Sequence, residues 1–432
     1  MKDKKYSREP FPPSGSLSTG EGGGRGLLNH IKNIADIWWQ ETIAIFKDSG
    51  ALLFCIALPL AYPILYSWIY NNEVVREVPV VVVDDSHSAL SREFIQRVDA
   101  SPDVSVAFYA GNLHEAQSVI GHGDAYGILY FPRTFATSVG RHEQSHVSVY
   151  CDMSYMLTYK AIFQTAQTVS SLMGAKIQVA QSGTYTNREA EISAKPLDFE
   201  EVPIFNTTGG YGNFILPAVL VLIIQQSLLL SVGLLSGTQR EKHFSMVKNV
   251  IDSYFGKGLA FCFIYAVMLA YTTLVVPRLF GFVMMVHFLD WVIFMTPYLI
   301  ACVGFAVVGS EMIRFRENVM LTAVCTSIPF LFLSGISWPQ SGIPGFWQGV
   351  AQCLPSTFAI RGFVRMSSMG ARIGDVLPEF RALSILAIVY CLLALGVMYR
   401  RYLIRQQFED VAESRKNREL EANKKVQPSE SK

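Results

Sequence analysis

The run FILPAVLVLIIQQSLLLSVGLLS, residues 214–236, decides the fold because it contains no Asp, Glu, Lys or Arg and is long enough to cross a bilayer. A spanning helix needs about 20 apolar residues, since the hydrocarbon core offers its backbone no water. Five further charge-poor apolar stretches occur along the chain. The six predicted transmembrane helices are 51–70, 212–236, 258–280, 288–310, 319–339 and 380–400. The predicted fold class is therefore a polytopic α-helical membrane protein.

The composition agrees with this prediction and disfavours other classes. Hydrophobic residues make up 50% of the 432 residues and charged residues 16%, whereas soluble chains carry about 25% charged residues. Lys and Arg number 36 against 35 Asp and Glu, so there is no overall basic charge with which to hold nucleic acid. The seven cysteines fall mostly inside apolar runs, which argues against a disulfide framework. An ordinary soluble enzyme and a nucleic-acid-binding protein are both disfavoured.

The distribution of Lys and Arg predicts the orientation, because these residues are retained on the cytoplasmic side. Residues 1–50 carry seven of them, the segment 237–257 carries four and the segment 311–318 carries two. The tail from Arg400 onward carries nine more. These segments alternate correctly for six spans, so both termini are expected to be cytoplasmic.

The two ends of the chain have different compositions. Residues 1–26 are rich in Gly, Pro and Ser, and a disordered cytoplasmic tail is expected there. From 27 to 48, apolar residues recur at helical spacing opposite charged ones, which predicts an amphipathic interfacial helix. A helix packed on a soluble partner is the alternative. Residues 401–432 are expected to form a second cytoplasmic tail.

The segment 71–208 separates the first two predicted spans and predicts a mixed α/β domain on the extracytoplasmic side. Its strands and helices alternate, which is typical of such domains. Strands are expected at 78–83, 104–109, 125–131 and 147–150, and helices at 88–98, 113–120 and 155–180.

Two connecting segments differ from ordinary loops. The segment 237–256 is charged and amphipathic, and it is expected either to press a helix against a cytoplasmic partner or to form a solvated interfacial turn. The segment 340–372 is too apolar for an exposed loop and is interrupted by Pro344 and Pro355. Broken apolar segments at membrane depth are tolerated where they are buried in protein or line a cavity. A re-entrant hairpin on the outer side is therefore predicted.

One catalytic motif matches by letter, since residues 142–146 read HEQSH, an HExxH zinc-protease pattern. The chemistry needs a helix, because only there do residues four apart turn both imidazoles to one metal. Gly140 precedes the motif, and residues 147–150 alternate like a strand directly after it. The pattern favours a polar turn, and no metal site is predicted.

The chain carries no energy-coupling motif of its own. Its only Gly-Lys pair, Gly256-Lys257, lacks the other residues of a phosphate-binding loop. The cores of these spans, 51–70, 214–236, 258–277, 291–310, 319–339 and 382–399, contain no Asp, Glu, Lys or Arg, whereas ion-coupled carriers usually place charged groups within the bilayer. If the chain transports a solute, the energy is expected to come from another subunit. Gln225 and Gln226, near the middle of a span, are candidates for a solute path, and an interhelical hydrogen bond is the alternative.

Five stretches carry a resemblance to a known family: WWQETIAIFKDSGALLFCIALPLAYPILYSWIYNNEVVREVPVVVVDDS (38–86), SREFIQRVDASPDV (91–104), HEAQSVIGHGDAYGILYFPRTFATSVGR (114–141), VSVYCDMS (147–154) and LFLSGISWPQSGIPGFWQGVAQCLPSTFAIRGF (331–363). They resemble the permease subunit of bacterial ATP-binding-cassette exporters of the second type, in the branch with a large periplasmic domain after the first helix. The resemblance extends over roughly residues 30–408. It implies a permease of the bacterial inner membrane that exports a small molecule, a lipid or another substrate.

The resemblance also implies partners. A separate ATPase subunit would hold ATP and Mg, so no cofactor is expected on this chain, and a second permease copy would complete a homo- or heterodimer. A periplasmic adaptor, an outer-membrane channel and membrane lipids are further expected partners. The ATPase-coupling surface is assigned to Arg240, Glu241, Phe244, Lys248 and Trp38. The path is assigned by position to Gln225, Gln226, Ser334 and Ser337. The re-entrant motif comprises Gly335, Pro339, Pro344, Gln348, Pro355 and Arg361.

The chain departs from the family pattern at two points. The first cytoplasmic loop of the family usually reads R-E-x-x-x-G-T, and residues 245–247 replace its Gly-Thr portion here. Thr207 stands where the proline of an FNP-type motif is expected. These changes suggest an idiosyncratic ATPase contact. Two other functions remain open from sequence: a membrane-anchored binding or assembly protein that uses its outer domain, and an outer zinc metalloprotease.

Overall fold

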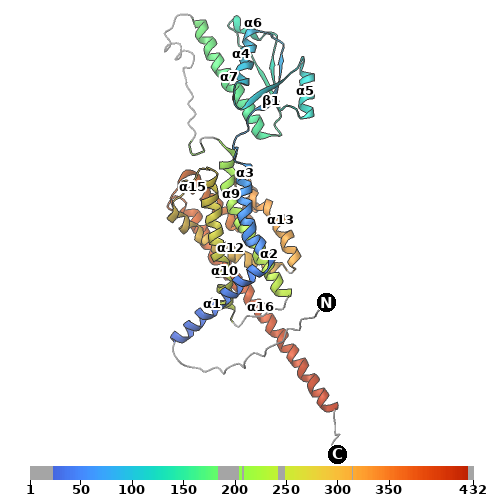
Figure 1. Ribbon diagram of the computed structural model, residues 1–432, viewed down its shortest axis with the longest axis vertical. Coiled ribbons are helices and arrows are strands. Elements are labelled where there is room, and N and C mark those ends of the chain that lie inside the picture. The colour runs from blue at the N-terminus through green and yellow to red at the C-terminus, as the bar shows by residue number, and fades with distance from the viewer. Residues whose placement is uncertain (1–22, 183–203, 207–208, 242–248, 314, 427–432) are drawn as a thin grey trace, which may run out of the picture.

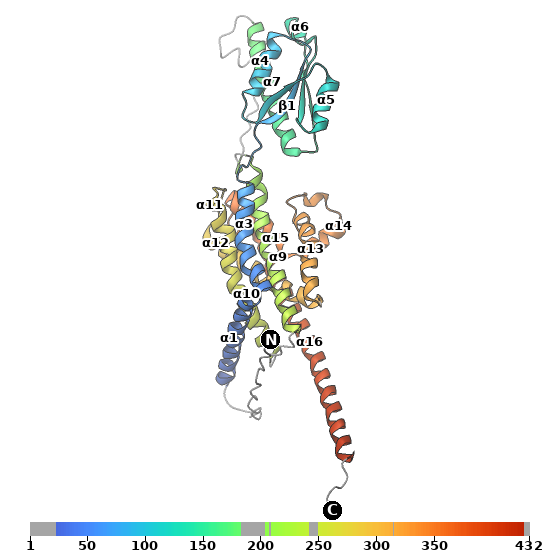
Figure 2. The same cartoon turned by 45° about the vertical axis from the view of Figure 1, so that its right-hand side comes forward.

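The computed structural model describes residues 23–182, 204–206, 209–241, 249–313 and 315–426 (Figure 1). A helical bundle forms the middle of the molecule, a small α/β unit lies beyond one end of it, and two helices, α1 and α16, extend from the other end (Figures 1 and 2).

Within the described residues, five helices are long and apolar enough to cross a membrane: Ser49–Ile69, Tyr211–Glu241, Val250–Leu279, Phe288–Met312 and Leu377–Gln407. The first consists of α2 (Ser49–Leu52), a π-helical segment (Leu53–Ala57) and α3 (Leu58–Ile69). The second is α9 (Tyr211–Glu241). The third consists of α10 (Val250–Ala270), a second π-helical segment (Tyr271–Val275) and α11 (Val276–Leu279). The fourth and fifth are α12 (Phe288–Met312) and α16 (Leu377–Val426). The chain is thus a multi-pass helical membrane protein.

Helix α9 forms the centre of the bundle. Its most apolar stretch is 89% buried, whereas the corresponding stretches of Ser49–Ile69 and Leu377–Gln407 are only 22% and 17% buried. Ile224 of α9 packs in one core with the buried rings of Tyr265, Phe294 and Phe363. The outer helices therefore leave large apolar faces for lipid or for another chain.

The sixth predicted span, 319–339, falls on a shorter helix. Helix α13 covers Arg316–Leu333, 18 residues, and its first turn is polar. At 1.5 Å per residue it is about 27 Å long, slightly less than the roughly 30 Å of a hydrocarbon core. It is not among the five candidate spans. The count of six spans stays a prediction.

Three prolines divide the segment after α13 into short pieces. Pro339 precedes a 3-10 turn (Gln340–Gly342), Pro344 precedes α14 (Gly345–Gln352), and Pro355 is the first residue of α15 (Pro355–Met369). Proline lacks a backbone N–H, so it is favoured at helix starts and disfavoured inside helices. Helix α15 packs back into the bundle with a buried face.

The α/β unit contains a four-stranded sheet in the order β2-β1-β3-β4. The strands are β1 (Val78–Asp84), β2 (Val104–Tyr109), β3 (Gly127–Phe131) and β4 (Ser148–Cys151), close to the predicted ranges. Strand β1 pairs in parallel with β2 and β3, while β4 is antiparallel to β3. The continuous Val run of β1 suits this central position, because a parallel strand is covered on both faces.

Helices cover both faces of the sheet. They are α4 (Ala89–Asp99), α5 (Leu113–His122), α6 (Phe135–Gly140) and α7 (Met156–Ser182). Helices α4, α6 and α7 pack on the face that contains Val80 and Val82, while α5 packs on the face that contains Val81 and Val83. Helix α6 has no counterpart in the sequence prediction.

Several predicted boundaries change. Helix α1 covers Gly23–Lys47, so residues 23–26 are helical and do not belong to a disordered tail; residues 1–22 lie outside the described residues. Helix α16 continues through the predicted tail to Val426. Helix α9 continues to Glu241 and α10 begins at Val250, so the predicted coupling loop is largely helical at both ends. Its middle, 242–248, lies outside the described residues.

Candidate functional site

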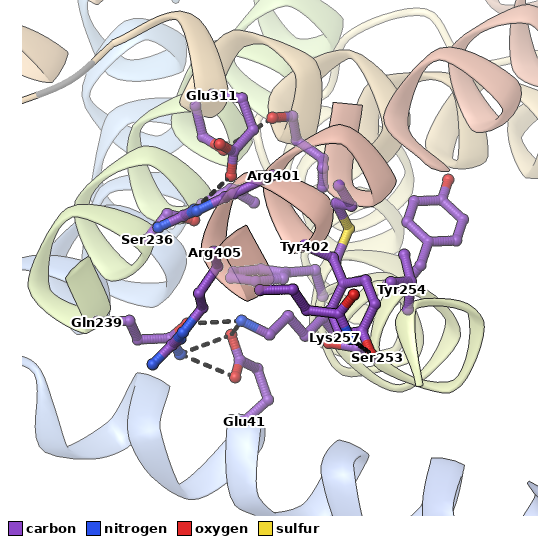
Figure 3. Close-up of a pocket in the computed structure, with 18 residues that line it drawn as sticks. Glu41, Ser236, Gln239, Ser253, Tyr254, Lys257, Glu311, Arg401, Tyr402 and Arg405 are labelled. Atoms are coloured by element: carbon purple, nitrogen blue, oxygen red, sulfur yellow. Dashed lines mark hydrogen bonds and ion pairs between the residues drawn. The ribbon is translucent and has the colours of Figure 1, made fainter. Parts of the chain in front are cut away.

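Charged and polar side chains from five helices gather around a cavity at the end of the bundle where α1 and the distal part of α16 lie (Figure 3). The cavity has a volume of about 160 Å³. Its polar lining residues include Glu41, Gln239, Lys257, Glu311, Arg401 and Arg405. They come from α1, α9, α10, α12 and α16, so the site depends on how all five helices pack.

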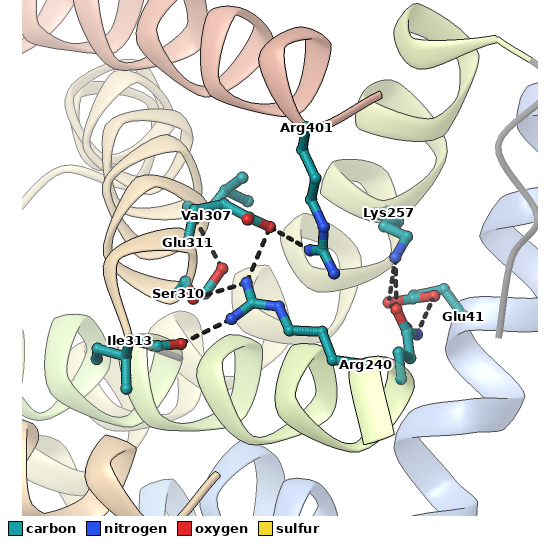
Figure 4. Close-up of polar contacts among 9 residues, drawn as sticks. Glu41, Arg240, Lys257, Val307, Ser310, Glu311, Ile313 and Arg401 are labelled. Carbon is teal, nitrogen blue, oxygen red and sulfur yellow. Dashed lines mark hydrogen bonds and ion pairs between the residues drawn. The ribbon is translucent and has the colours of Figure 1, made fainter. Parts of the chain in front are cut away.

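Arg240, in the last turn of α9, fastens α9 to the end of α12 (Figure 4). Its Nη1 donates to the carbonyl of Ile313 at 2.6 Å, and its Nη2 donates to the carbonyl of Ser310 at 2.8 Å. Helix α12 ends at Met312, and the last carbonyls of a helix have no partner within it. The guanidinium therefore caps α12.

Glu311 connects this cap to α16. Its Oε1 lies 2.9 Å from Nη2 of Arg240 and 2.7 Å from Nη1 of Arg401. The Glu311 and Arg240 side chains are only 16% and 18% exposed, so solvent weakens their attraction less than at an open surface. One carboxylate thus holds two guanidinium groups from different helices.

A second group joins α1, α9 and α10. Glu41 is buried and accepts two hydrogen bonds from Nε2 of Gln239, at 2.9 and 3.1 Å. Nζ of Lys257 donates to Oε1 of Gln239 at 2.6 Å and lies 3.8 Å from Glu41. The amide of Gln239 is thus held at both of its polar atoms, which fixes its orientation.

Helix α1 is held along α10 by further polar contacts. Asp252 is 2% exposed, and its carboxylate lies 2.9 Å from Nδ1 of His30 and 3.3 Å from Nδ2 of Asn33. Trp38, predicted for the coupling surface, packs edge-on against Phe263 of α10, with ring centroids 6.3 Å apart. Helix α1 is therefore part of the bundle end and does not lie apart from it.

A third group surrounds Asp48, the N-cap of α2. Its carboxylate accepts hydrogen bonds from Oγ1 of Thr238 at 2.6 Å, from Nη2 of Arg316 at 2.9 Å and from two backbone N–H groups of α2. Burial acts to raise the pKa of Asp48, but these hydrogen bonds and the Arg316 charge outweigh it, so the pKa lies below its ordinary value of 3.8. This carboxylate therefore ties the start of α2 to α9 and α13.

Replacing Asp48 with Asn is expected to lower the stability at neutral pH by about 1–2 kcal/mol, because Arg316 loses its charged partner. The folded pKa of Asp48 is lowered, so its contribution is present above pH 3.8 and is lost as the pH falls through the folded pKa. Thermal unfolding of the purified chain at pH 7 and at decreasing pH measures both effects. At acid pH, where Asp48 is protonated, the wild type and Asp48→Asn should have the same free energy of unfolding. Asp36→Asn, at an exposed position of α1, is the control and should match wild type.

The structure does not bring all predicted coupling residues together. Arg240 and Trp38 belong to the bundle end, and Glu241 is exposed beside Arg240. Phe244 and Lys248 lie outside the described residues. Sequence reasoning did not assign the larger part of the site, namely Glu41, Gln239, Lys257, Glu311 and Arg401. The available signal was that Gln239, Lys257, Glu311 and Arg401 lie near the ends of apolar runs, on the side where Lys and Arg are concentrated, and that Glu41 lies in the amphipathic helix before the first run.

Gln225, assigned to the path, makes an interhelical hydrogen bond, as its alternative interpretation expected. Its Oε1 accepts the backbone N–H of Ser356 at 2.8 Å, within the first turn of α15. The first N–H groups of a helix lack partners, so Gln225, 1% exposed, caps α15 in the core. Both polar atoms of the Gln226 amide are buried and have no hydrogen-bond partner among the described residues.

The remaining predicted residues lie after α13. Ser334 is fully buried and donates to the carbonyl of Leu331, whereas Ser337 is exposed. Gly335 has a φ of 86°, which favours glycine. Nε2 of Gln348 donates to the carbonyls of Gln340 and Ile343 and so closes the turn before α14. The guanidinium of Arg361 lies 5.6 Å from the ring centre of Phe358.

The HExxH match does not form a metal site. Residues 142–147 are not helical, and His142 has a φ of 61° in the turn after α6. Within the described part of the chain, no group of three or more His, Cys, Asp or Glu side chains is placed to hold a metal ion. The two histidines are therefore not arranged as the protease chemistry requires.

Comparison with known proteins gives a consistent result. The profile of a family described as ABC-2 family transporter protein matches residues 50–395. The linearmycin resistance permease protein LnrN of Bacillus subtilis (strain 168) is 21% identical over 381 residues, which cover 80% of this chain and 94% of that protein. No solved structure matches the chain significantly.

Proposed function

Since the chain belongs to the ABC-2 family of transporter proteins and is a membrane permease, we propose that it is the transmembrane subunit of an ATP-driven exporter in a bacterial inner membrane. Family membership implies a transport subunit rather than an enzyme. It also implies partnership with an ATPase of the ATP-binding-cassette class. In this proposal both termini are cytoplasmic, and the partner ATPase holds ATP and Mg.

The observation that carries the proposal is the polar network at the end of the bundle. The ends of α9 and α10 flank the segment 242–248, where we place the ATPase contact. Arg240 connects α9 to α12, and Glu311 connects both to α16. Lys257 and Gln239 connect α10 to α9, and Glu41 connects both to α1. A displacement of this segment would therefore move several helices together rather than one.

The exposed apolar faces support a second permease copy. Helix α3 exposes Leu60, Ile64 and Trp68, the last at 72%. Helix α13 exposes Leu321, Val324 and Ile328. In a membrane, packing rather than water exclusion drives helix association, so such faces suit either lipid or a second chain. We propose a homo- or heterodimer through one of these faces, with the α/β unit on the outer side as the contact for an adaptor and an outer-membrane channel.

The test is co-expression of the chain with a candidate ATPase subunit that carries a GxxxxGK[ST] motif. We expect the two proteins to purify together and the ATPase rate in proteoliposomes to rise with a transported compound. Since the similar B. subtilis protein is named for linearmycin resistance, linearmycin is the first compound to test. A Walker-lysine variant of the ATPase is the control. If no ATPase associates and no compound changes hydrolysis, the chain would be a binding or assembly protein instead, and the proposal would be wrong.

A further inference from the structure

The turn between β4 and α7 exposes a run of apolar side chains. Residues 153–157 read MSYML, and no charged residue occurs between Asp152 and Lys160. We call residues 153–157 the apolar turn. Its large side chains are 42–74% exposed, and they are Met153, Tyr155, Met156 and Leu157. A contiguous apolar patch on the surface of a folded unit marks a contact with a membrane or with another protein.

The apolar turn has a defined conformation. The backbone N–H of Ser154 donates to Oδ1 of Asp152 at 2.9 Å, and the backbone N–H of Asp152 donates to the carbonyl of Tyr126 at 2.9 Å. The ring of Tyr155 packs edge-on against the ring of Tyr126, with centroids 5.5 Å apart. These contacts tie the turn to the start of β3, so its other apolar side chains are held away from the core of the α/β unit.

The register of the sheet places the apolar turn on the side of the bundle. Strand β1 begins at Val78, which the chain reaches directly from the bundle (Figures 1 and 2). Val80 of β1 pairs with Gly127 of β3, and Gly127 pairs with Cys151 at the end of β4. The end of β4 therefore lies beside the start of β1. The apolar turn follows β4 directly, so it lies at the end of the sheet that faces the bundle.

The nearby end of the bundle carries a series of tyrosines. Tyr62, Tyr66 and Tyr70 follow one another along the first span, and Tyr211 is the first residue of the second. The centroids of successive rings in this series lie 5.6–6.2 Å apart. Tyrosine is enriched where a spanning helix passes the lipid headgroups. Tyr70 and Tyr211, at the ends of their spans, therefore mark the level of the membrane surface.

Both connections hold the apolar turn close to this level. The backbone N–H of Tyr211 donates to the carbonyl of Glu73 at 3.0 Å. The five steps from Glu73 to Val78 span at most about 17 Å, since an extended chain advances about 3.4 Å per residue. On the return connection, a Cβ atom on Gly209 would lie 3.9 Å from Nζ of Lys160. Gly209 is two residues from Tyr211, and Lys160 is less than one helical turn from the apolar turn.

We propose that the apolar turn inserts into the headgroup region of the membrane in which the bundle lies, with Met153, Met156 and Leu157 toward the acyl chains and Lys160 beside lipid phosphates. Apolar side chains next to a basic residue are typical of interfacial anchors. A lipid surface is favoured over a protein partner because the chain itself fixes the turn at the level of Tyr211. The proposal does not depend on the ATPase, on the substrate or on the direction of transport.

The test uses the full-length chain in proteoliposomes of dioleoyl phosphatidylcholine and dioleoyl phosphatidylglycerol. The photoreactive residue p-benzoylphenylalanine replaces Met156 in one variant and Tyr109 in the control. Tyr109 is similarly exposed, at 69%, but it pairs with Val82 near the opposite end of β1. After illumination, mass spectrometry should find roughly tenfold more lipid adduct at position 156 than at position 109, because only an interfacial side chain reaches the lipids. Both positions are exposed, so both variants should keep the wild-type unfolding temperature.

A second variant tests whether the whole turn inserts. With p-benzoylphenylalanine in place of Met153, the double substitution Met156→Asp/Leu157→Asp should reduce the lipid adduct severalfold, because charged side chains leave the apolar region. An unchanged adduct would overturn the proposal, as would equal lipid adducts at positions 156 and 109. A cross-link from position 156 to a second copy of the chain, without lipid adduct, would also overturn it and would assign the turn to contact between permease copies.

Discussion

Arg240→Ala is expected to remove most transport activity and to lower the stability of the purified chain by about 2–4 kcal/mol. The substitution leaves the carbonyls of Ser310 and Ile313 without their guanidinium partner and removes one of the two cations on Glu311. These groups are mostly buried, so water replaces the lost hydrogen bonds poorly. The measurements are thermal unfolding of the detergent-purified chain and ATPase-dependent transport per molecule of folded protein.

Two further variants make this prediction specific. Arg240→Lys keeps the charge but cannot present two parallel N–H groups, so it should recover only part of the stability. Glu241→Ala changes an exposed neighbour and should behave as wild type. Wild-type stability in Arg240→Ala would show that the α12 cap is not important. Reduced stability with unchanged transport per molecule would refute the role of Arg240 in coupling.

Gly362→Ala is expected to destabilise the bundle by about 1–3 kcal/mol, because there is no room for a methyl group at this position. A Cβ atom on Gly362 of α15 would lie 2.1 Å from Cζ of Phe294, a fully buried ring of α12. Either this ring or the whole of α15 would have to move. The expected result is a lower unfolding temperature and less folded protein in the membrane fraction.

Gly349→Ala is the control for this prediction. A Cβ atom on Gly349, within α14, meets nothing within 4 Å, and alanine is favoured over glycine in a helix by about 1 kcal/mol. Stability should therefore stay the same or rise. The double variant Gly362→Ala/Phe294→Leu should recover part of the loss by making room. An unchanged unfolding temperature for Gly362→Ala would contradict the close packing of α15 on α12.

Much of the fold could be predicted because its causes are local. Charge-free runs located the five long apolar helices, the Val run at 78–83 located the central strand, and prolines located the breaks around α14. The structure does not confirm the predicted span at 319–339. The helix found there, α13, is short because polar residues occupy its first turn and the chain turns at Gly335, just after its last residue. The sheet order and the inward packing of α15 depend on contacts distant in the sequence, so no local pattern predicts them.

The site was harder to predict for the same reason. Arg240 was found through a family pattern, but its partners lie on α12, more than one span away along the chain. In the sequence, Lys257 stands out only as part of a Gly-Lys pair that lacks the other residues of a phosphate-binding loop. Glu311 and Arg401 each look like an ordinary charge at the end of an apolar run. Their pairing follows from the packing of α9, α12 and α16 and is not visible in any single segment.

The shared carboxylate of Glu311 makes the two attachments at the bundle end unequal. If Arg401 withdraws, Glu311 still has Arg240, and no buried charge is stranded. If Arg240 withdraws, two carbonyls of α12 also lose their donor. Loss of the Arg401 contact at this end of α16 therefore costs less free energy than loss of the Arg240 contacts between α9 and α12, while the rest of α16 stays packed on α12. The charge at position 240 is thus expected to be the less replaceable of the two.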